Sequence, residues 1–262
     1  MIDLLLAMPT ILGAVTFMAI TTLVGLAVYF LSFRCVAYNR SEDQLKEVKE
    51  ATSNLFRVVG WLISLFLSLT FADVYRELIA IENASEAEAA AIMDTHDNLS
   101  RVEATKARDL LIEYTRAVIN DDWPALANDR LSPRTGELLS ALKTEIFELP
   151  ANNLREETIR ARILQDMDVV SDLRLLRQQK AQSNPPYILI VVLVGYLVTM
   201  AYFGVYRPRS SLLVLVTFYT LLVGIVLYLI LAMSAPFQSG FGISPAPFEY
   251  VIESVEKDVY AR

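Results

Sequence analysis

The stretch SLFLSLTFADVYRELIAIENASEAEAAA, residues 64–91, passes from an apolar run into an acidic run with no loop between them. Its carboxylates start where the apolar run ends, at Asp73, Glu77, Glu82, Glu86 and Glu88. They indicate either the mouth of a pore or the solvent-exposed end of a long helix. In both cases the pattern predicts one helix that leaves a membrane unbroken and continues to about residue 95.

Four stretches of the chain carry no charge, at residues 4–33, 58–72, 187–206 and 210–248. An apolar helix of about 18 residues or more can cross the ~30 Å hydrocarbon layer. The run at 58–72 reaches that length only if it extends from Arg57 to Arg76, with both arginines snorkelling towards the interfaces. We therefore predict spans at 10–33, 57–76, 187–206 and 211–234.

These spans predict an all-α membrane protein with four transmembrane helices and a helical extramembrane domain between spans 2 and 3. We expect a transmembrane hairpin at 1–74 with its loop at 34–56, a helical domain at 75–185, a second hairpin at 186–236 and a tail at 237–262. Within the loop, residues 41–54 predict a short amphipathic helix. In the helical domain, Ser100 to Glu103, Ser132-Pro133 and Asn153 to Glu156 predict helix starts.

The basic residues of the short loops predict the orientation in the membrane, because Lys and Arg are retained in the cytoplasm. The loop at 34–56 and its edge carry Arg34, Arg40, Lys46, Lys49 and Arg57, and the loop near 208 carries Arg207 and Arg209. Both loops are therefore predicted to be cytoplasmic, with both termini and residues 75–185 outside an inner membrane. Residues 75–185 are acidic overall, which argues against a nucleic-acid partner.

The second span offers candidate pore-lining residues, of which Arg57 would lie at the cytoplasmic mouth. Gly60, Ser64 and Ser68 recur every four residues, a spacing that suits close helix packing or a polar pore wall. Asp73 and Glu77 could form a ring of carboxylates at a pore mouth, or Asp73 could pair locally with Arg76. The sequence does not decide between helix packing and a pore wall for the small residues, or between a carboxylate ring and local pairing for the acids.

Catalytic and metal-binding patterns are missing from the sequence. The single histidine, His96, lies between Asp94 and Asp97, but on a helix those two aspartates share a face from which His96 points away. No second cluster of ligands would complete a metal shell. We expect no metal, no cofactor and no enzymatic activity.

Several short motifs, in this order, resemble the bestrophin-like family of four-span membrane proteins. They are Glu86-Ala87 and Glu88-Ala89, Trp123-Pro124, Arg174 ahead of span 3, Pro236-Phe237 and Ser244-Pro245. The resemblance covers nearly the whole chain. It departs at Ser234, where the family usually has an aspartate two residues before Pro-Phe, so this chain has no carboxylate at that position.

The resemblance implies distant kinship with bestrophins, which are pentameric anion channels with four spans per subunit. In bestrophins the segment between spans 2 and 3 is cytosolic, whereas the loop charges here place it outside. We therefore expect a homo-oligomer in a lipid bilayer with an ion path beside span 2, and the acidic outer domain favours cations. The alternative is a scaffold subunit that binds another membrane protein through its outer helices, with Tyr114 and Trp123 at the contact.

Overall fold

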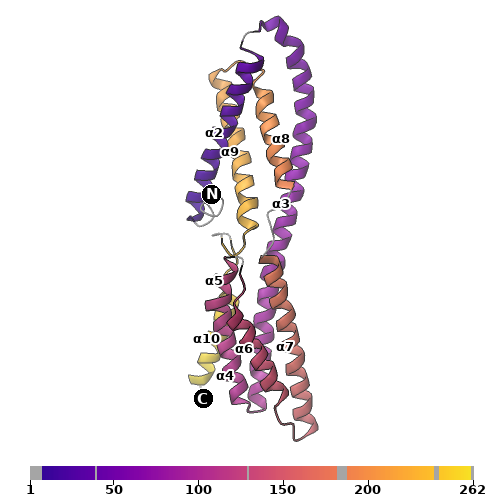
Figure 1. The fold of residues 1–262 in the computed structure, drawn as a ribbon, viewed down its shortest axis with the longest axis vertical. Coiled ribbons are helices and arrows are strands. Elements are labelled where there is room, and N and C mark those ends of the chain that lie inside the picture. Colours follow the sequence, from indigo (N-terminus) through magenta and orange to yellow (C-terminus); the bar gives the residue numbers. More distant parts are fainter. Residues whose placement is uncertain (1–7, 39, 129, 182–187, 239–241, 261–262) are drawn as a thin grey trace. The chain divides into compact units, whose positions relative to one another are not determined.

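The computed structural model describes residues 8–38, 40–128, 130–181, 188–238 and 242–260, and their secondary structure is entirely helical. This confirms the all-α class for the described part of the chain. The helices are, in order, α2 (Thr10–Val36), α3 (Glu42–Arg101), α4 (Thr105–Ala117), the π-helix η1 (Val118–Asp122), α5 (Trp123–Leu126), α6 (Pro133–Phe147), α7 (Leu154–Ala181), α8 (Ile188–Phe203), α9 (Ser210–Met233) and α10 (Ala246–Tyr260) (Figure 1).

The chain divides into two compact units, and α3 contributes to both. Unit 1 comprises Met1–Arg76, Asn184–Ser234 and Ser239–Phe241, and unit 2 comprises Glu77–Ser183, Ala235–Gln238 and Gly242–Arg262. The apolar part of α3 thus belongs to unit 1, whereas its acidic part belongs to unit 2.

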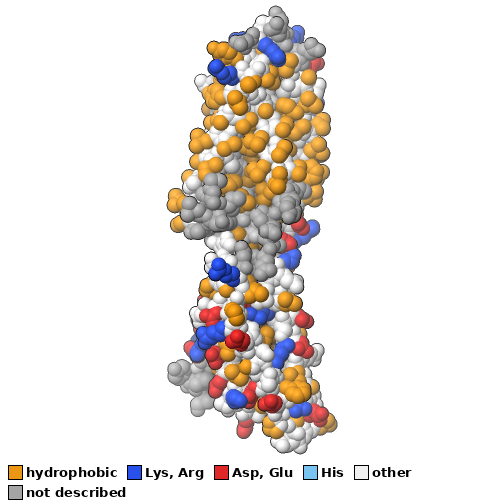
Figure 2. All heavy atoms as spheres, in the orientation of Figure 1, with side chains coloured by type: hydrophobic (Ala, Val, Ile, Leu, Met, Phe, Trp, Pro, Cys, Tyr) orange, Lys and Arg blue, Asp and Glu red, His pale blue; other side chains and the backbone are white. Residues whose placement is uncertain are grey.

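Unit 1 contains the helices that suit a membrane. By length and composition, α2, α9 and the apolar part of α3 could each cross one, and α8 is apolar but shorter. The start of the predicted span 187–206 lies outside the described residues. In Figure 2, hydrophobic side chains cover most of the visible surface over α2, α8 and α9, as expected for helices that face lipid.

Within unit 1, α2 packs closely against α8 and α9. The Tyr196 hydroxyl donates to the Thr21 carbonyl at 2.7 Å, and the Ser32 hydroxyl donates to the Ala201 carbonyl at 2.6 Å. A Cβ atom at Gly204 would come within 2.7 Å of the Phe33 backbone nitrogen, so a side chain would push the helices apart there. Small residues and serines therefore hold this part of the bundle together.

Unit 2 has an apolar core built from α3, α4, α6, α7 and α10. Two predicted helix starts are confirmed in it. The Ser132 hydroxyl accepts a hydrogen bond from the Thr135 amide ahead of α6, and the Asn153 side chain accepts one from the Glu156 amide at 2.9 Å ahead of α7.

The predicted helix cap at Ser100 was wrong, and two other segments have more helix than their descriptions implied. The loop helix and the second span are parts of the single helix α3, and this helix ends at Arg101. Ser100 does not cap a new helix, because its hydroxyl donates to the His96 carbonyl within α3. The chain turns instead at Glu103, whose φ of 53° is left-handed. The segment predicted as a C-terminal tail contains α10, which packs in the core of unit 2.

Candidate functional site

The apolar part of α3 exposes the residues predicted to line a pore. The side chains of Arg57, Ser64 and Ser68 are exposed, and no atom lies within 4 Å of where a Gly60 Cβ would be. The Ser68 hydroxyl donates to the Ser64 carbonyl one turn back. Among the described residues, no other helix of this chain therefore packs closely at Gly60.

Helix geometry divides the predicted pore-lining set. Successive α-helical residues turn by about 100°, so Asp73 lies about 140° around α3 from Ser68. We name two sides of the helix by some of their residues: the polar side includes Arg57, Gly60, Ser64 and Ser68, and the aliphatic side includes Leu55, Val58, Leu62, Leu65 and Leu69. Asp73 follows Leu69 by one turn and is exposed at the end of the aliphatic side.

Glu77, the other predicted mouth residue, forms an ion pair in unit 2. The Lys180 ammonium of α7 lies 2.7 Å from its carboxylate, and both side chains are partly exposed. Sequence reasoning missed this pair, because the partner lies 103 residues away. Glu77 is therefore tied to α7, whereas Asp73 is an exposed carboxylate.

A second candidate site is the buried ionic cluster of unit 2, which consists of Glu88, Tyr114, Asp122, Arg174 and Arg177. The Arg177 guanidinium is fully buried and lies 3.4 Å from both carboxylates, Glu88 and Asp122. Arg174 binds Asp122 through two nitrogens at 3.1 and 3.3 Å. Two cations thus face two anions, which is the condition for burying such charges.

Two aromatic rings pack against the Arg177 guanidinium of this cluster. The Arg177 guanidinium lies 5.0 Å from the Trp123 ring and 5.3 Å from the Phe248 ring, within cation–π range. Trp123 is fixed by its indole nitrogen, which donates to the Ile243 carbonyl at 3.0 Å. Phe237 packs edge-on against Trp123. The cluster therefore joins α3, η1 and α7 to the segment that leads into α10.

Burial is the largest influence on the pKa values of Glu88 and Tyr114 in this cluster. It raises the pKa of Glu88 above its ordinary value, although Arg177 and the Tyr114 hydrogen bond oppose that shift. The Tyr114 hydroxyl donates to Glu88 at 2.8 Å, and burial raises the pKa of Tyr114 well above its ordinary value. Tyr114 therefore acts as a neutral donor to a carboxylate that is costly to ionise.

A π-helix supplies one of the two buried carboxylates. The turn η1 ends at Asp122, directly before Trp123-Pro124. Proline has no backbone N–H, so it cannot continue the regular hydrogen-bond pattern of α4. Wide turns of this kind are common at functional sites. Here the wide turn places Asp122 and Trp123 together in the cluster.

The family-motif residues from distant parts of the chain meet at or near this cluster. Glu88 and Arg174 belong to it, and Trp123 and Phe237 pack beside it. The Pro236 carbonyl accepts from the Ile243 amide at 2.9 Å and closes the loop against Trp123. The remaining motif residues, which lie at the surface or start a helix, are Glu86, Pro124, Ser244 and Pro245.

Sequence reasoning missed Asp122 and Arg177, although each lies near a motif residue. Arg177 follows Arg174 by three positions, so both lie on one face of α7. Trp123 and Tyr114 are buried, which overturns their predicted role at a partner surface. His96 is also buried, and the described residues hold no group of potential metal ligands.

Comparison with known proteins identifies the family. A family model described as a bestrophin-like domain matches residues 19–248. The chain belongs to the bestrophin-like family. Crystal structures of two point variants of a bacterial bestrophin homologue from Klebsiella pneumoniae resemble it, each at 13% identity. Their TM-scores are 0.63 and 0.60, and the matches cover 94% and 92% of this chain and 97% and 96% of the homologue.

A further crystal structure, described only as a variant of a membrane protein, has a TM-score of 0.62 at 12% identity. That match covers 93% of this chain and 96% of the other. At identities this low, the structural matches show a shared fold and nothing beyond it. No curated protein matched the sequence. The resemblance inferred from the order of short motifs is thus confirmed, and the chain is a membrane protein with the bestrophin-like fold.

Proposed function

We propose that this bestrophin-like protein is a homo-oligomeric ion channel whose path runs along the polar side of α3. The observation that carries the proposal is the exposure of α3 within unit 1. Only 6% of its most apolar 18-residue stretch is buried, against 17% for the corresponding stretch of α2 and 39% for that of α9. A helix with so little contact in its own chain is the one available to line an axis or contact another copy.

The two sides of α3 suit two different surroundings. The aliphatic side has the composition expected of a helix that faces lipid or packs against another copy, whereas the hydroxyls and Gly60 suit contact with water. Arg57 would lie at the loop end of this path, with Ser64 and Ser68 along it. Asp73 and Glu77 lie at its other end, where Asp73 would act from the aliphatic flank.

The acidic balance of residues 75–185 supports a preference for cations over anions. The competing assignment, a scaffold subunit for another membrane protein, is weakened by the burial of both aromatic residues offered as its contacts. Scaffold function would then rest on exposed apolar side chains such as Phe147 and Leu154.

Conductance measurements on the purified protein in planar bilayers test this proposal. We expect conductance to fall when Ser68→Phe narrows the polar side, and to persist in the matched control Leu69→Phe on the aliphatic side. Reversal potentials in a KCl gradient would measure the cation preference. A wild-type protein without conductance, or equal loss in both variants, would contradict the proposed path.

The predicted orientation has a direct test, because Cys35 is the only cysteine and is exposed. A membrane-impermeant maleimide added to intact cells should leave a cytoplasmic Cys35 unlabelled. The control is the double variant Cys35→Ser, Tyr250→Cys, which moves the thiol to the exposed side of α10 and should be labelled. The reverse pattern would place unit 2 in the cytoplasm, as in bestrophins.

A further inference from the structure

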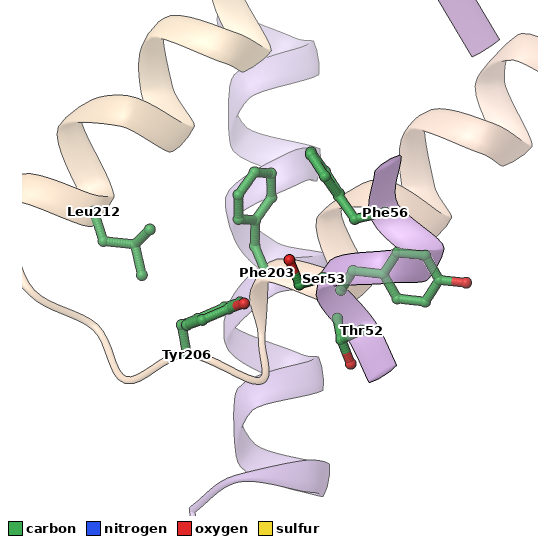
Figure 3. A pocket seen from close by; sticks show the side chains of 7 residues that line it. Thr52, Ser53, Phe56, Phe203, Tyr206 and Leu212 are labelled. Carbon is green, nitrogen blue, oxygen red and sulfur yellow. The ribbon is translucent and has the colours of Figure 1, made fainter. Parts of the chain in front are cut away.

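Unit 1 contains an aromatic pocket at the end where the chain passes from α2 to α3 and from α8 to α9. The pocket has a volume of about 250 Å³ and is lined by Thr52, Ser53, Phe56, Tyr202, Phe203, Tyr206 and Leu212. Figure 3 shows Phe203, Tyr206 and Leu212 facing the Ser53 and Phe56 side of α3. The Phe56 and Phe203 rings meet edge-on at 5.2 Å and form one wall.

The walls are largely apolar, and their few polar groups are hydroxyls of Thr52, Ser53, Tyr202 and Tyr206. Small-molecule sites usually enclose about 300–1,000 Å³. This pocket is smaller, so it suits a ligand of which only a slender apolar part enters. Its position at the end of the apolar helices is where tyrosines commonly meet the lipid interface.

Basic residues lie next to the lining residues in the sequence, and one of them contacts the pocket wall. The Lys49 ammonium lies 6.0 Å from the centre of the Tyr206 ring, which is itself part of the wall. Arg57 follows Ser53 by one turn of α3 and is exposed. Arg207 comes directly after Tyr206, and Arg209 directly precedes α9, three residues before Leu212.

Acidic residues are fewer in this region. Glu50 is an exposed neighbour of Lys49 on α3, and the loop sequence also contains Glu42, Asp43 and Glu47. Against these four stand seven basic residues, namely Arg34, Arg40, Lys46, Lys49, Arg57, Arg207 and Arg209. The region therefore has a net positive charge beside an apolar pocket. This combination matches an acyl chain joined to an anionic headgroup.

We propose that this pocket binds an anionic phospholipid, with part of one acyl chain among Phe56, Phe203 and Leu212 and the phosphate beside Lys49 and Arg209. Basic residues close to the membrane surface attract anionic lipid headgroups, and the aromatic walls would bury the chain. The site is independent of whether α3 lines an ion path. It would tie the α2–α3 and α8–α9 connections to the lipid surface.

Native mass spectrometry of the full-length protein in mild detergent tests this site, using equal amounts of phosphatidylglycerol and phosphatidylcholine as probes. We expect wild-type protein to retain several-fold more phosphatidylglycerol. Ser53→Phe places a ring in the pocket and should abolish that excess, and Leu212→Trp should do the same from α9. The matched control Leu65→Phe, on the aliphatic side of α3, should leave lipid retention unchanged.

The double variant Lys49→Gln, Arg209→Gln should lower retention of phosphatidylglycerol to that of phosphatidylcholine, whereas Lys46→Gln should not. Equal retention of the two lipids by the wild type would overturn the assignment of an anionic headgroup. Unchanged retention in both Ser53→Phe and Leu212→Trp would overturn the assignment to this pocket. Melting curves followed by tryptophan fluorescence would establish that the variants are folded.

Discussion

The two units of this chain bury different kinds of side chain. In unit 1 the large apolar residues are often exposed, as Ile11 and Trp61 are at 81% and 80%, and the helices meet through glycine, serine and tyrosine. In unit 2 the apolar residues form a core, and charged side chains spread over the visible surface in Figure 2. The first pattern suits lipid as the solvent, and the second suits water.

The two units also differ in where their charged and polar side chains lie. In unit 2, Arg177, Glu88 and Asp122 are fully buried and are held by one another and by Tyr114 and Trp123. On the apolar part of α3 the Ser64 and Ser68 side chains are instead exposed. Buried charges thus fix the fold of unit 2, whereas exposed hydroxyls on α3 are the groups available for function.

The largest predicted effect is the loss of Arg177. Replacing it with Met leaves two carboxylates buried without their shared cation, which should lower the free energy of unfolding by about 3–5 kcal/mol. Arg116→Met is the matched control, because its pair with Glu256 is exposed and should be worth about 0–1 kcal/mol. Denaturation in detergent, followed by tryptophan fluorescence, measures both. If Arg177→Met lowers the free energy of unfolding as little as Arg116→Met does, the buried cluster does not stabilise unit 2.

A tryptophan in each unit allows the comparison to be made with one side chain. Trp123 is 8% exposed and packs against Phe237 and Phe248, so Trp123→Ala should cost about 3–5 kcal/mol. Trp61 is 80% exposed, and Trp61→Ala should change stability by less than about 0.5 kcal/mol. The remaining tryptophan reports unfolding in each variant. A large loss at Trp61 would reveal a contact with another copy of the chain.

The pH dependence of stability should carry a smaller contribution from Glu88. Its ordinary pKa is 4.5, and burial raises the pKa in the folded protein. Between those two values the folded state holds a proton that the unfolded state has lost. The stabilising contribution is therefore complete below the unfolded pKa and is lost as the pH rises through the folded pKa.

Glu88→Gln removes this titration, so its stability relative to wild type should increase as the pH rises above the ordinary pKa of 4.5. The exposed neighbour Glu86→Gln serves as the control and should follow the wild-type curve. Melting temperatures measured across that range test the expectation. Parallel curves for wild type and Glu88→Gln would mean that Glu88 keeps one protonation state throughout.

The fold was largely predictable, because periodicity and charge-free runs are local signals. They gave the all-α class, two of three helix starts in unit 2 and the continuous exit of α3 from its apolar part. Ser100 failed as a cap because its hydroxyl had an equally local alternative, the His96 carbonyl. Capping patterns thus show where a helix can start. Here the chain turns at Glu103, and α4 begins after that turn, at Thr105.

The candidate site was less predictable, since its contacts join distant residues. Glu88, Asp122 and Arg177 lie 34 to 89 residues apart along the chain, and no spacing rule connects them. The family resemblance brought Glu88, Trp123 and Arg174 into view without their geometry. The division of α3 into two sides could have been found from the sequence, because Ser68 and Asp73 are five positions apart.

The smallest predicted effect concerns an ion pair of unit 2, between Lys180 and Glu77. Lys180 pairs with Glu77 at 2.7 Å, but both side chains are about one-third exposed, so the pair should contribute about 0–1 kcal/mol. Lys180→Gln should therefore leave the melting temperature nearly unchanged at high salt and lower it slightly at low salt. Lys257→Gln, in an exposed pair with Glu253 at 3.8 Å, gives the baseline for such pairs. A loss at Lys180 that persists in high salt would show that Glu77 is shielded from solvent, as a residue at a closed pore mouth in an oligomer would be.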